Sequence, residues 1–236
     1  MIIAEIGLNH MGSLNLLKKY IRKLNQSDVD AITVQIVSKN LFKQYNINKQ
    51  YFINEKVIYK TVFKESKKKI GLIIDKVTHD TKKYSKKISF FKILGDQVND
   101  SELLKSINKF KKKIFISNKN QKKKGQKKLN ALCRKHKNIF LIHTQGYKKS
   151  DPKYSNLFNI NKINNATNKK TSFGLHCVDL NIAYLSLLFN PLNLFFYIKG
   201  NKKLKYPDNE YAIHLHSLEK FVKQIKKLKN SIDFWK

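Results

Sequence analysis

The sequence is poor in arginine, acidic residues, cysteine and proline. Only Arg22 and Arg134 are arginines among 49 basic residues, and 16 acidic residues leave a formal net charge of +33 at pH 7. The planar guanidinium group of arginine binds phosphates and base edges through paired hydrogen bonds, which the ammonium group of lysine does less well. The scarcity of arginine therefore argues against a surface selected for specific nucleic-acid recognition. The joint abundance of lysine, asparagine and isoleucine indicates the compositional drift of an AT-rich genome. We still expect weak, non-specific, salt-sensitive binding to polyanions.

Cysteines and long apolar runs are also scarce. Cys133 and Cys177 form no close pair and no metal-type spacing, which is typical of a reducing, cytoplasmic setting. The most apolar stretch, Ile182–Ile198, is interrupted by Asn190-Pro191 and by Asn193, so we expect no membrane span. We also expect no signal peptide before the first strand.

The 236 residues, 41% of them hydrophobic, suffice for one buried core, and we predict a single domain over residues 1–236. Short β-branched runs alternate along the chain with amphipathic helical patterns. This alternation predicts the α/β class and, with eight strands, a single (β/α)8 barrel of the TIM type. A doubly wound open sheet is the alternative, because sequence determines the number of strands poorly.

The predicted strands are Ile2–Ile6, Ala31–Ile36, Ile70–Ile74, Ser89–Ile93, Ile114–Ser117, Ile139–His143, Thr171–Leu175 and Leu194–Ile198. The predicted helices are Ser13–Gln26, Thr78–Lys87, Ser101–Phe110, Gln121–His136, Asp179–Phe189 and Ser217 to about Leu228. The connections 43–69 and 150–170 are long, and we predict irregular loops over an active-site face. Lysine clusters at 67–69, 111–113 and 122–124 are interpreted as a solvated rim.

The most informative stretch is IIAEIGLNHMGS, residues 2–13. A β-branched run ends in the carboxylate of Glu5, the amide of Asn9 and the imidazole of His10, and a Gly-Ser pair then opens an amphipathic helix. Polar groups at the point where a strand meets a helix are typical of α/β active sites. An ordinary first strand followed by a helix cap is the alternative interpretation.

The pattern Ala-Glu-x-Gly-x-Asn-His-x-Gly-Ser resembles the opening of the sialic acid synthase family. The resemblance implies a barrel enzyme in which C3 of phosphoenolpyruvate attacks the aldehyde of an open-chain N-acetylmannosamine-type sugar, giving a nonulosonic acid and phosphate. The family adds a small antifreeze-protein-like domain after its barrel, and we expect no counterpart of that domain in residues 1–236. Weaker similarity continues at Asp30-Ala31, Val34-Gln35, Phe91-Lys92-Ile93, Ile116-Ser117, Leu141-Ile142-His143, Tyr147, Gly174 and Pro207-Asp208.

The resemblance also implies roles for the retained polar residues. Lys92 and Ser117 fall at positions that resemble the family's ligands for the phosphate and carboxylate of phosphoenolpyruvate. Glu5 and Asp208 resemble its sugar-binding carboxylates, and Glu5 is also a candidate for proton transfer. Asn9 would orient a ligand through hydrogen bonds. In the alternative, Lys92 is a barrel-interior lysine that simply pairs with Glu5.

Other residues of the family's site are replaced in this sequence, and among them are groups with a role in catalysis. Thr33 stands where the family has a second-strand lysine. Gln97 stands at the proposed general base and cannot take a proton, so the adjacent Asp96 is the remaining candidate catalytic carboxylate. Tyr147, shortly after the sixth strand, is retained as a candidate substrate-binding residue.

The family's metal site is also altered. Its divalent ion, manganese or magnesium, is bound by two histidines that align here with Val178 and Ile198. Only His176 and His143 remain nearby as candidate ligands, and a lone histidine at a strand end is more often structural.

The sequence therefore predicts a sialic acid synthase-like protein whose activity is impaired. Its partners would be phosphoenolpyruvate and an N-acetylhexosamine, and it would form a homodimer or associate with an active paralogue. Two alternatives belong to other classes of function. One is a catalytically degenerate barrel that serves as a binding or regulatory subunit, and the other is a basic polyanion-binding protein that uses the lysine-rich rim.

Overall fold

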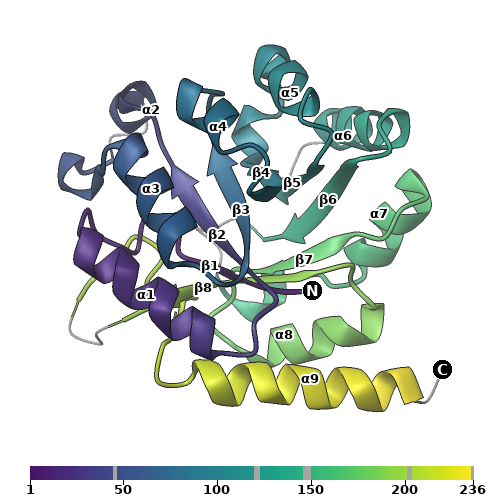
Figure 1. The fold of residues 1–236 in the computed structure, drawn as a ribbon. Helices are drawn as coiled ribbons and strands as arrows, with labels where there is room; N and C mark the ends of the chain where they lie inside the picture. The colour runs from purple at the N-terminus through teal and green to yellow at the C-terminus, as the bar shows by residue number, and fades with distance from the viewer. Residues whose placement is uncertain (45–46, 120–122, 146–149, 201–203, 235–236) are drawn as a thin grey trace.

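The computed structural model describes residues 1–44, 47–119, 123–145, 150–200 and 204–234. Its centre is a closed barrel of eight parallel strands that follow one another in chain order, and pairing of the first strand with the eighth closes it (Figure 1). The strands are β1 (Ile2–Glu5), β2 (Ala31–Ile36), β3 (Lys69–Ile74), β4 (Ile88–Ile93), β5 (Lys113–Lys119), β6 (Ile139–Thr144), β7 (Ser172–Leu175) and β8 (Leu194–Lys199). A short β9 (Ile213–His214) pairs with β8 outside the barrel.

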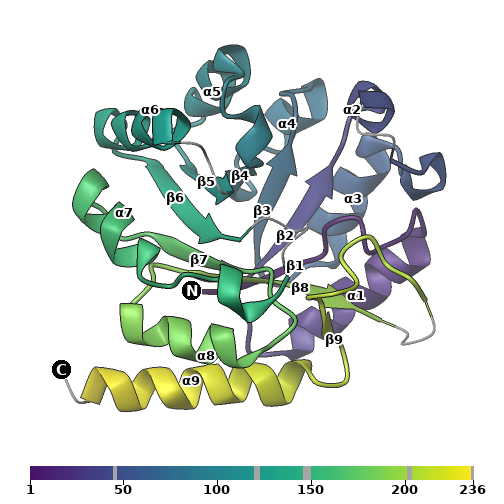
Figure 2. The ribbon, with the colours of Figure 1, turned by 180° about the vertical axis from the view of Figure 1, so that it is seen from behind.

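Helices surround the barrel, as Figure 2 shows from behind. The α-helices are α1 (Leu14–Gln26), α2 (Lys39–Gln44), α3 (Glu55–Glu65), α4 (His79–Lys83), α5 (Ser101–Asn108), α6 (Lys123–Lys135), α7 (Asn159–Thr167), α8 (Asn181–Ser186) and α9 (Leu218–Phe234). Single 3-10 turns are η1 (Lys49–Tyr51), η2 (Gly95–Gln97), η3 (Pro152–Tyr154) and η4 (Leu187–Phe189). The closed barrel confirms the predicted (β/α)8 fold and excludes the open sheet.

The barrel strands are buried on both faces, which explains their nearly continuous apolar runs. Outward residues such as Ile32 and Val34 pack under the helices in the large core. Inward residues form a separate layer, because Phe115 of β5 meets Phe195 of the distant β8 with ring centroids 5.6 Å apart. The members of this inner layer are Ile3, Ala31, Phe90, Phe115, Ile142 and Phe195.

The prediction that residues 43–69 form an irregular loop is wrong, because this connection contains α3. The side chain of Asn54 accepts a hydrogen bond from the backbone N–H of Lys56 and caps the helix start. The helix then buries Ile58, Tyr59 and Val62 against the barrel. The spacing of these residues is helical, but lysines and the surrounding polar residues obscured it in the sequence.

The prediction for residues 150–170 is wrong for a related reason, because α7 occupies 159–167. Ile160, Ile163 and Thr167 of this helix are buried. Asparagine is a weak helix former, and its frequency here hid the periodicity. Asn168, in the left-handed conformation that asparagine tolerates, ends the helix.

Two predicted helices also have different lengths. The helix predicted over 78–87 is only the short α4, which begins with a capping box at Thr78 and ends at Lys83. The last helix continues to Phe234 rather than to about Leu228. Within the described parts of the chain, no helix is both long and apolar enough to span a membrane.

Candidate functional site

A buried ion pair lies inside the barrel, above the inner layer. The ammonium nitrogen Nζ of Lys92 donates to both carboxylate oxygens of Glu5, at 2.7 and 2.6 Å, and the two side chains are 3% and 1% exposed. Lys92 follows Phe90 by two residues on β4, and Glu5 follows Ile3 by two residues on β1. Because strand side chains alternate, both groups must face inward, one step closer to the carboxyl ends of the strands.

Other inward groups complete the surroundings of this pair. Thr33 Oγ1 donates to Glu5 Oε2 at 3.2 Å. The Nζ of Lys92 lies 5.4 Å from the ring centroid of Phe195 and 5.6 Å from that of Tyr197, which is cation–π range. The ammonium is thus held by one carboxylate and two aromatic rings. An anionic ligand that reached it would compete with Glu5 for the same cation.

Asn9 ties the end of β1 to β8 and to the loop beyond it. Its Nδ2 donates to the carbonyl of Ile198 at 2.8 Å, and its Oδ1 accepts from the backbone N–H of Asp208 at 3.1 Å. Its own carbonyl accepts from the Tyr20 hydroxyl at 3.2 Å. Since both atoms of the amide already bond the backbone, the side chain of Asn9 fixes where Asp208 lies.

Asp208 lies beside the ion pair of Lys92 and Glu5, and aromatic side chains are grouped around it. Tyr211 donates its hydroxyl to Asp208 Oδ1 at 2.9 Å, and the Tyr211 ring stacks on His176 with centroids 4.6 Å apart. Burial raises the pKa of Asp208 to about 6, and the nearby charge of Glu5 acts in the same direction. The hydrogen bond from Tyr211 and the charge of Lys92 act against this rise in pKa.

Gly7 makes the close approach of these groups feasible. Its φ is +55°, in the left-handed region that glycine adopts without a steric penalty. A Cβ at this position would lie 2.6 Å from the Tyr197 ring and 2.9 Å from Asp208 Oδ2. The glycine of the opening motif therefore leaves the space that Asp208 and Tyr197 occupy.

The raised pKa of Asp208 predicts a pH-dependent stability. A carboxyl whose folded pKa exceeds its unfolded value of 3.8 stabilises the fold below about pH 4, and this contribution is lost as pH rises through about 6. An Asp208→Asn variant has no such loss. We therefore expect its free energy of unfolding to rise relative to the wild type by about 1–3 kcal/mol between pH 4 and pH 6.5. Urea unfolding at several pH values measures this, and a difference that does not change with pH would contradict it.

Ser117 shares the inward face, and the hydrogen bonds of the ion pair with described residues do not include it. It follows the inward Phe115 by two residues on β5 and is 4% exposed. Because Lys92 pairs in register with Phe115, Ser117 lies one step nearer the carboxyl ends, on the neighbouring strand. Asp96 is in η2, directly after β4, and its side chain is outside the described part of the structure, as is the whole of Tyr147.

The two histidine candidates lie in different places. His143 follows the inward Ile142, so its side chain points out of the barrel, where Nε2 lies 2.7 Å from the carbonyl oxygen of Ser155. Burial lowers the pKa of His143. His143 therefore does not share a site with Glu5, whereas His176, stacked on Tyr211, lies beside Asp208.

The described residues at the positions that align with the family's metal ligands do not fit a divalent metal ion. Val178 is 54% exposed and Ile198 is buried in the core outside the barrel, and neither side chain has a ligand atom. Among the residues that the structure describes, no three or more histidine, cysteine, aspartate or glutamate side chains are grouped as a metal site would require.

Sequence reasoning missed two aromatic members of the site. Tyr197 could have been found, because it follows the inward Phe195 by two residues on β8. Tyr211 lies in a loop after the last barrel strand, where neither strand alternation nor helical spacing applies, and no sequence signal identifies it.

Comparison with known proteins decides the family. Residues 20–235 match the family model described as the NeuB family. The chain belongs to the NeuB family. This confirms the resemblance seen first in the opening motif. Among curated protein sequences none matches significantly.

Solved structures share the fold of this NeuB-family chain. N-acetylneuraminic acid (sialic acid) synthetase from Leptospira borgpetersenii serovar Hardjo-bovis, in complex with citrate, has a TM-score of 0.84 and 18% identity over 98% of this chain and 84% of its own. Spore coat polysaccharide biosynthesis protein spsE from Bacillus subtilis has a TM-score of 0.83 and 18% identity, over 99% and 69%. A truncated 3-deoxy-D-arabino-heptulosonate 7-phosphate synthase from Thermotoga maritima has a TM-score of 0.69 and 10% identity, over 98% and 87%.

Proposed function

We propose that this chain is a sialic acid synthase-like protein of carbohydrate biosynthesis that binds phosphoenolpyruvate but condenses it poorly with an N-acetylmannosamine-type sugar. The observation that carries the proposal is the buried pair of Lys92 and Glu5, on inward positions toward the carboxyl ends of the strands. Barrel enzymes have their active sites at this end. NeuB-family membership supports the choice of substrates.

Phosphoenolpyruvate carries a phosphate and a carboxylate, which require a cation and hydrogen-bond donors. In the proposed complex one of these groups takes the ammonium of Lys92 from Glu5, and the Ser117 hydroxyl donates to the same ligand. Glu5, freed from Lys92, then accepts hydrogen bonds from sugar hydroxyls together with Asp208. When both substrates are bound, the exchange gives Lys92 an anionic partner and gives Glu5 hydrogen bonds from the sugar hydroxyls, so both buried charges keep partners.

We propose that the condensation activity is impaired because a metal site, a second cation and a general base that the family resemblance implies are lacking among the described residues. The described residues do not supply a site for manganese or magnesium, so we derive no step through such an ion. Thr33 adds a hydroxyl instead of a second cation, and Gln97 supplies no base. The same observations favour a second candidate function, in which the barrel binds phosphoenolpyruvate as a binding or regulatory subunit without turnover.

The binding part is tested by calorimetric titration of phosphoenolpyruvate into the wild type and a Ser117→Ala variant. Loss of one hydrogen bond to a charged group costs about 1.5–3 kcal/mol, so we expect the affinity to fall about 10- to 100-fold. Ser186→Ala is the matched control, because Ser186 is also buried but bonds the carbonyl of Ala183 on α8. Equal affinities for the two variants would contradict the placement of the ligand at Ser117.

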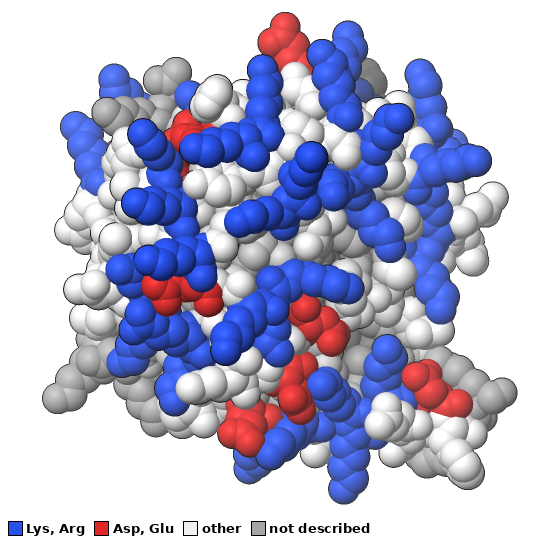
Figure 3. All heavy atoms as spheres, viewed as in Figure 1, with Lys and Arg blue, Asp and Glu red and all other residues white. Residues whose placement is uncertain are grey.

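The outer surface suggests a weaker, additional property. Lysine and arginine side chains are spread over the whole face seen in Figure 3, and they outnumber the acidic groups between them. We expect binding to nucleic acid that is weak, independent of sequence and lost as salt rises, because lysines attract phosphates without reading bases. Filter binding across salt concentrations tests this. Tight binding at physiological salt with clear preference among sequences would instead favour a dedicated polyanion-binding protein.

A further inference from the structure

Charge is unevenly distributed along the chain. Residues 103–150 contain fifteen lysines and Arg134 but no aspartate or glutamate, although the whole chain has 16 acidic residues. This segment runs through most of α5 and through β5, α6 and β6, and most of its basic residues belong to the helices and connections. The helices α5 and α6 are neighbours on the outside of the barrel in both ribbon views (Figures 1 and 2). The barrel therefore has a strongly basic sector around α5 and α6.

A groove runs between these two helices. It consists of two adjoining hollows of about 300 and 280 Å³, which share the lining residues Ser101, Leu104, Leu132 and Lys135. Each helix lines the groove with residues at positions i, i+3, i+4 and i+7, the spacing of one helix face. These residues are Ser101, Leu104, Lys105 and Asn108 on α5, and Lys128, Ala131, Leu132 and Lys135 on α6. Seven residues of helix extend about 10 Å, so the groove is about two helical turns long.

The floor of the groove is apolar and its walls are basic. Leu104 and Leu132 pack against the core and remain partly exposed, and Ala131 is exposed. The exposed basic residues along the two walls are Lys105, Lys128 and Lys135. At one end, Lys128 Nζ donates to the neutral Oδ1 of Asn99 at 2.8 Å. None of the described residues that line the groove is acidic, so its lysines have no carboxylate partner within it.

We propose that this α5–α6 groove is a docking site for an acidic amphipathic helix of another protein. Apolar side chains at i, i+3 or i+4 and i+7 of such a helix would pack on Leu104 and Leu132. Its acidic residues would then lie opposite the lysines of both walls. Charge complementarity selects this occupant, because a second copy of this chain, with net charge +33, would be repelled.

The lining of the groove favours a protein segment over a nucleic acid. Nucleic acids are bound through paired hydrogen bonds from arginine or by stacking of bases on aromatic rings. The described residues that line the groove include no arginine, phenylalanine, tyrosine or tryptophan. Two leucines and an alanine on the floor instead match the apolar face of a helix.

Fluorescence anisotropy with a labelled synthetic helix tests the proposal. The probe is a peptide of about three turns with leucines at i, i+3 and i+7 and glutamates on both flanks. A scrambled peptide of the same composition has the same charge but no apolar face. Because the groove is short, we expect a dissociation constant on the order of 10 µM for the amphipathic probe. The scrambled peptide should bind at least tenfold more weakly.

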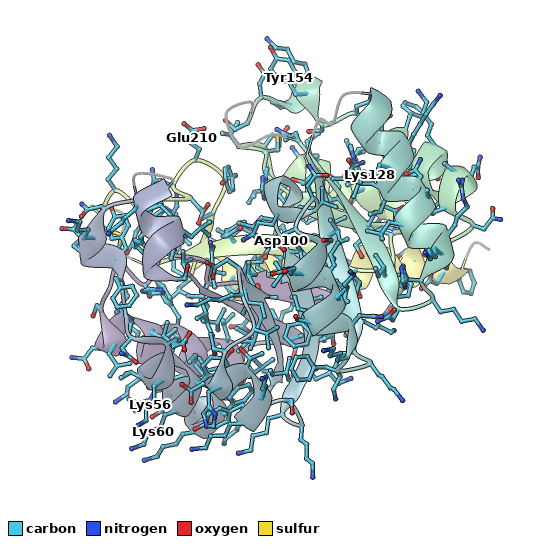
Figure 4. The ribbon with its side chains drawn as sticks, turned by 90° about the horizontal axis from the view of Figure 1, so that it is seen from above. Lys56, Lys60, Asp100, Lys128, Tyr154 and Glu210 are labelled. Atoms are coloured by element: carbon cyan, nitrogen blue, oxygen red, sulfur yellow. The ribbon has the colours of Figure 1, made fainter. Side chains whose placement is uncertain are left out.

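Replacing Leu132 by lysine separates packing from charge. Leu132→Lys increases the positive charge, so attraction by charge alone would strengthen binding, whereas loss of the apolar floor should weaken it at least tenfold. Ala131→Lys should have the same effect, and because Ala131 is exposed the fold does not depend on its side chain. Val57→Lys is the matched control, since Val57 is 39% exposed on α3. Its neighbours Lys56 and Lys60 lie on a different side of the barrel from Lys128 (Figure 4), so this variant should bind the probe like the wild type.

Circular dichroism melting shows whether each variant is folded. Equal affinity of the wild type for the amphipathic and scrambled peptides would overturn the proposal. So would folded Leu132→Lys and Ala131→Lys variants that bind the probe as tightly as the wild type, or a Val57→Lys variant that loses affinity equally. Single-stranded DNA that displaces the probe and itself binds tenfold more weakly to Leu132→Lys would assign the groove to nucleic acid instead.

Discussion

Replacing Lys92 by methionine is expected to destabilise the folded chain by about 3–5 kcal/mol, the usual cost of removing one member of a buried ion pair. The substitution keeps much of the side-chain volume but removes the cation from the carboxylate of Glu5, which is 1% exposed. Among the residues that the structure describes, the hydroxyl of Thr33 is then the remaining hydrogen-bond partner of this carboxylate. Urea unfolding measures the loss. The double variant Lys92→Met/Glu5→Gln removes both charges, and it should recover a large part of the lost free energy of unfolding.

The control for this experiment is an exposed ion pair. Lys223 and Glu219 lie one turn apart on α9, 2.7 Å from each other, with side chains 65% and 73% exposed. Such pairs contribute about 0–1 kcal/mol, so Lys223→Met should change stability little. If Lys92→Met were as mild as Lys223→Met, Glu5 would have to be solvated or bonded to another cation, and the ion pair could not be the centre of the site.

Much of the barrel could be predicted from the sequence because its strands are buried on both faces. Continuous β-branched and aromatic runs predict both ends of all eight barrel strands to within one or two residues. Strand alternation also implies that Glu5 and Lys92 face inward with Ile3 and Phe90. Their contact, across 87 positions of sequence, follows from closure of the barrel, which pattern alone does not prove.

What could not be predicted depends on weaker local signals. The helix α7 is rich in asparagine, so its propensity contradicts its structure, and packing of Ile160 and Ile163 against the barrel decides its conformation. Tyr211 reaches Asp208 from an irregular loop. The outward direction of His143, however, could have been inferred, because its neighbour Ile142 belongs to the inner layer.

The second large effect concerns turnover. We expect this chain alone to be a poor or inactive synthase, because two substitutions remove distinct contributions. Thr33 stands where the family resemblance implies a lysine, and this replacement would remove one charge-assisted contact to phosphoenolpyruvate, worth about 1.5–3 kcal/mol. Gln97 cannot take a proton, and loss of a general base costs about 10²–10⁴-fold in rate. Thr33 already donates its hydroxyl to Glu5, so it does not replace the missing cation.

The most direct test of the account is phosphate release from phosphoenolpyruvate and N-acetylmannosamine with added manganese, measured beside calorimetric titration of phosphoenolpyruvate. We expect phosphoenolpyruvate to bind with an affinity that depends on Lys92, and phosphate release to stay at or near the background rate. Robust manganese-dependent release that disappears in a His176→Ala variant would contradict this, because it would show a working metal site that includes His176.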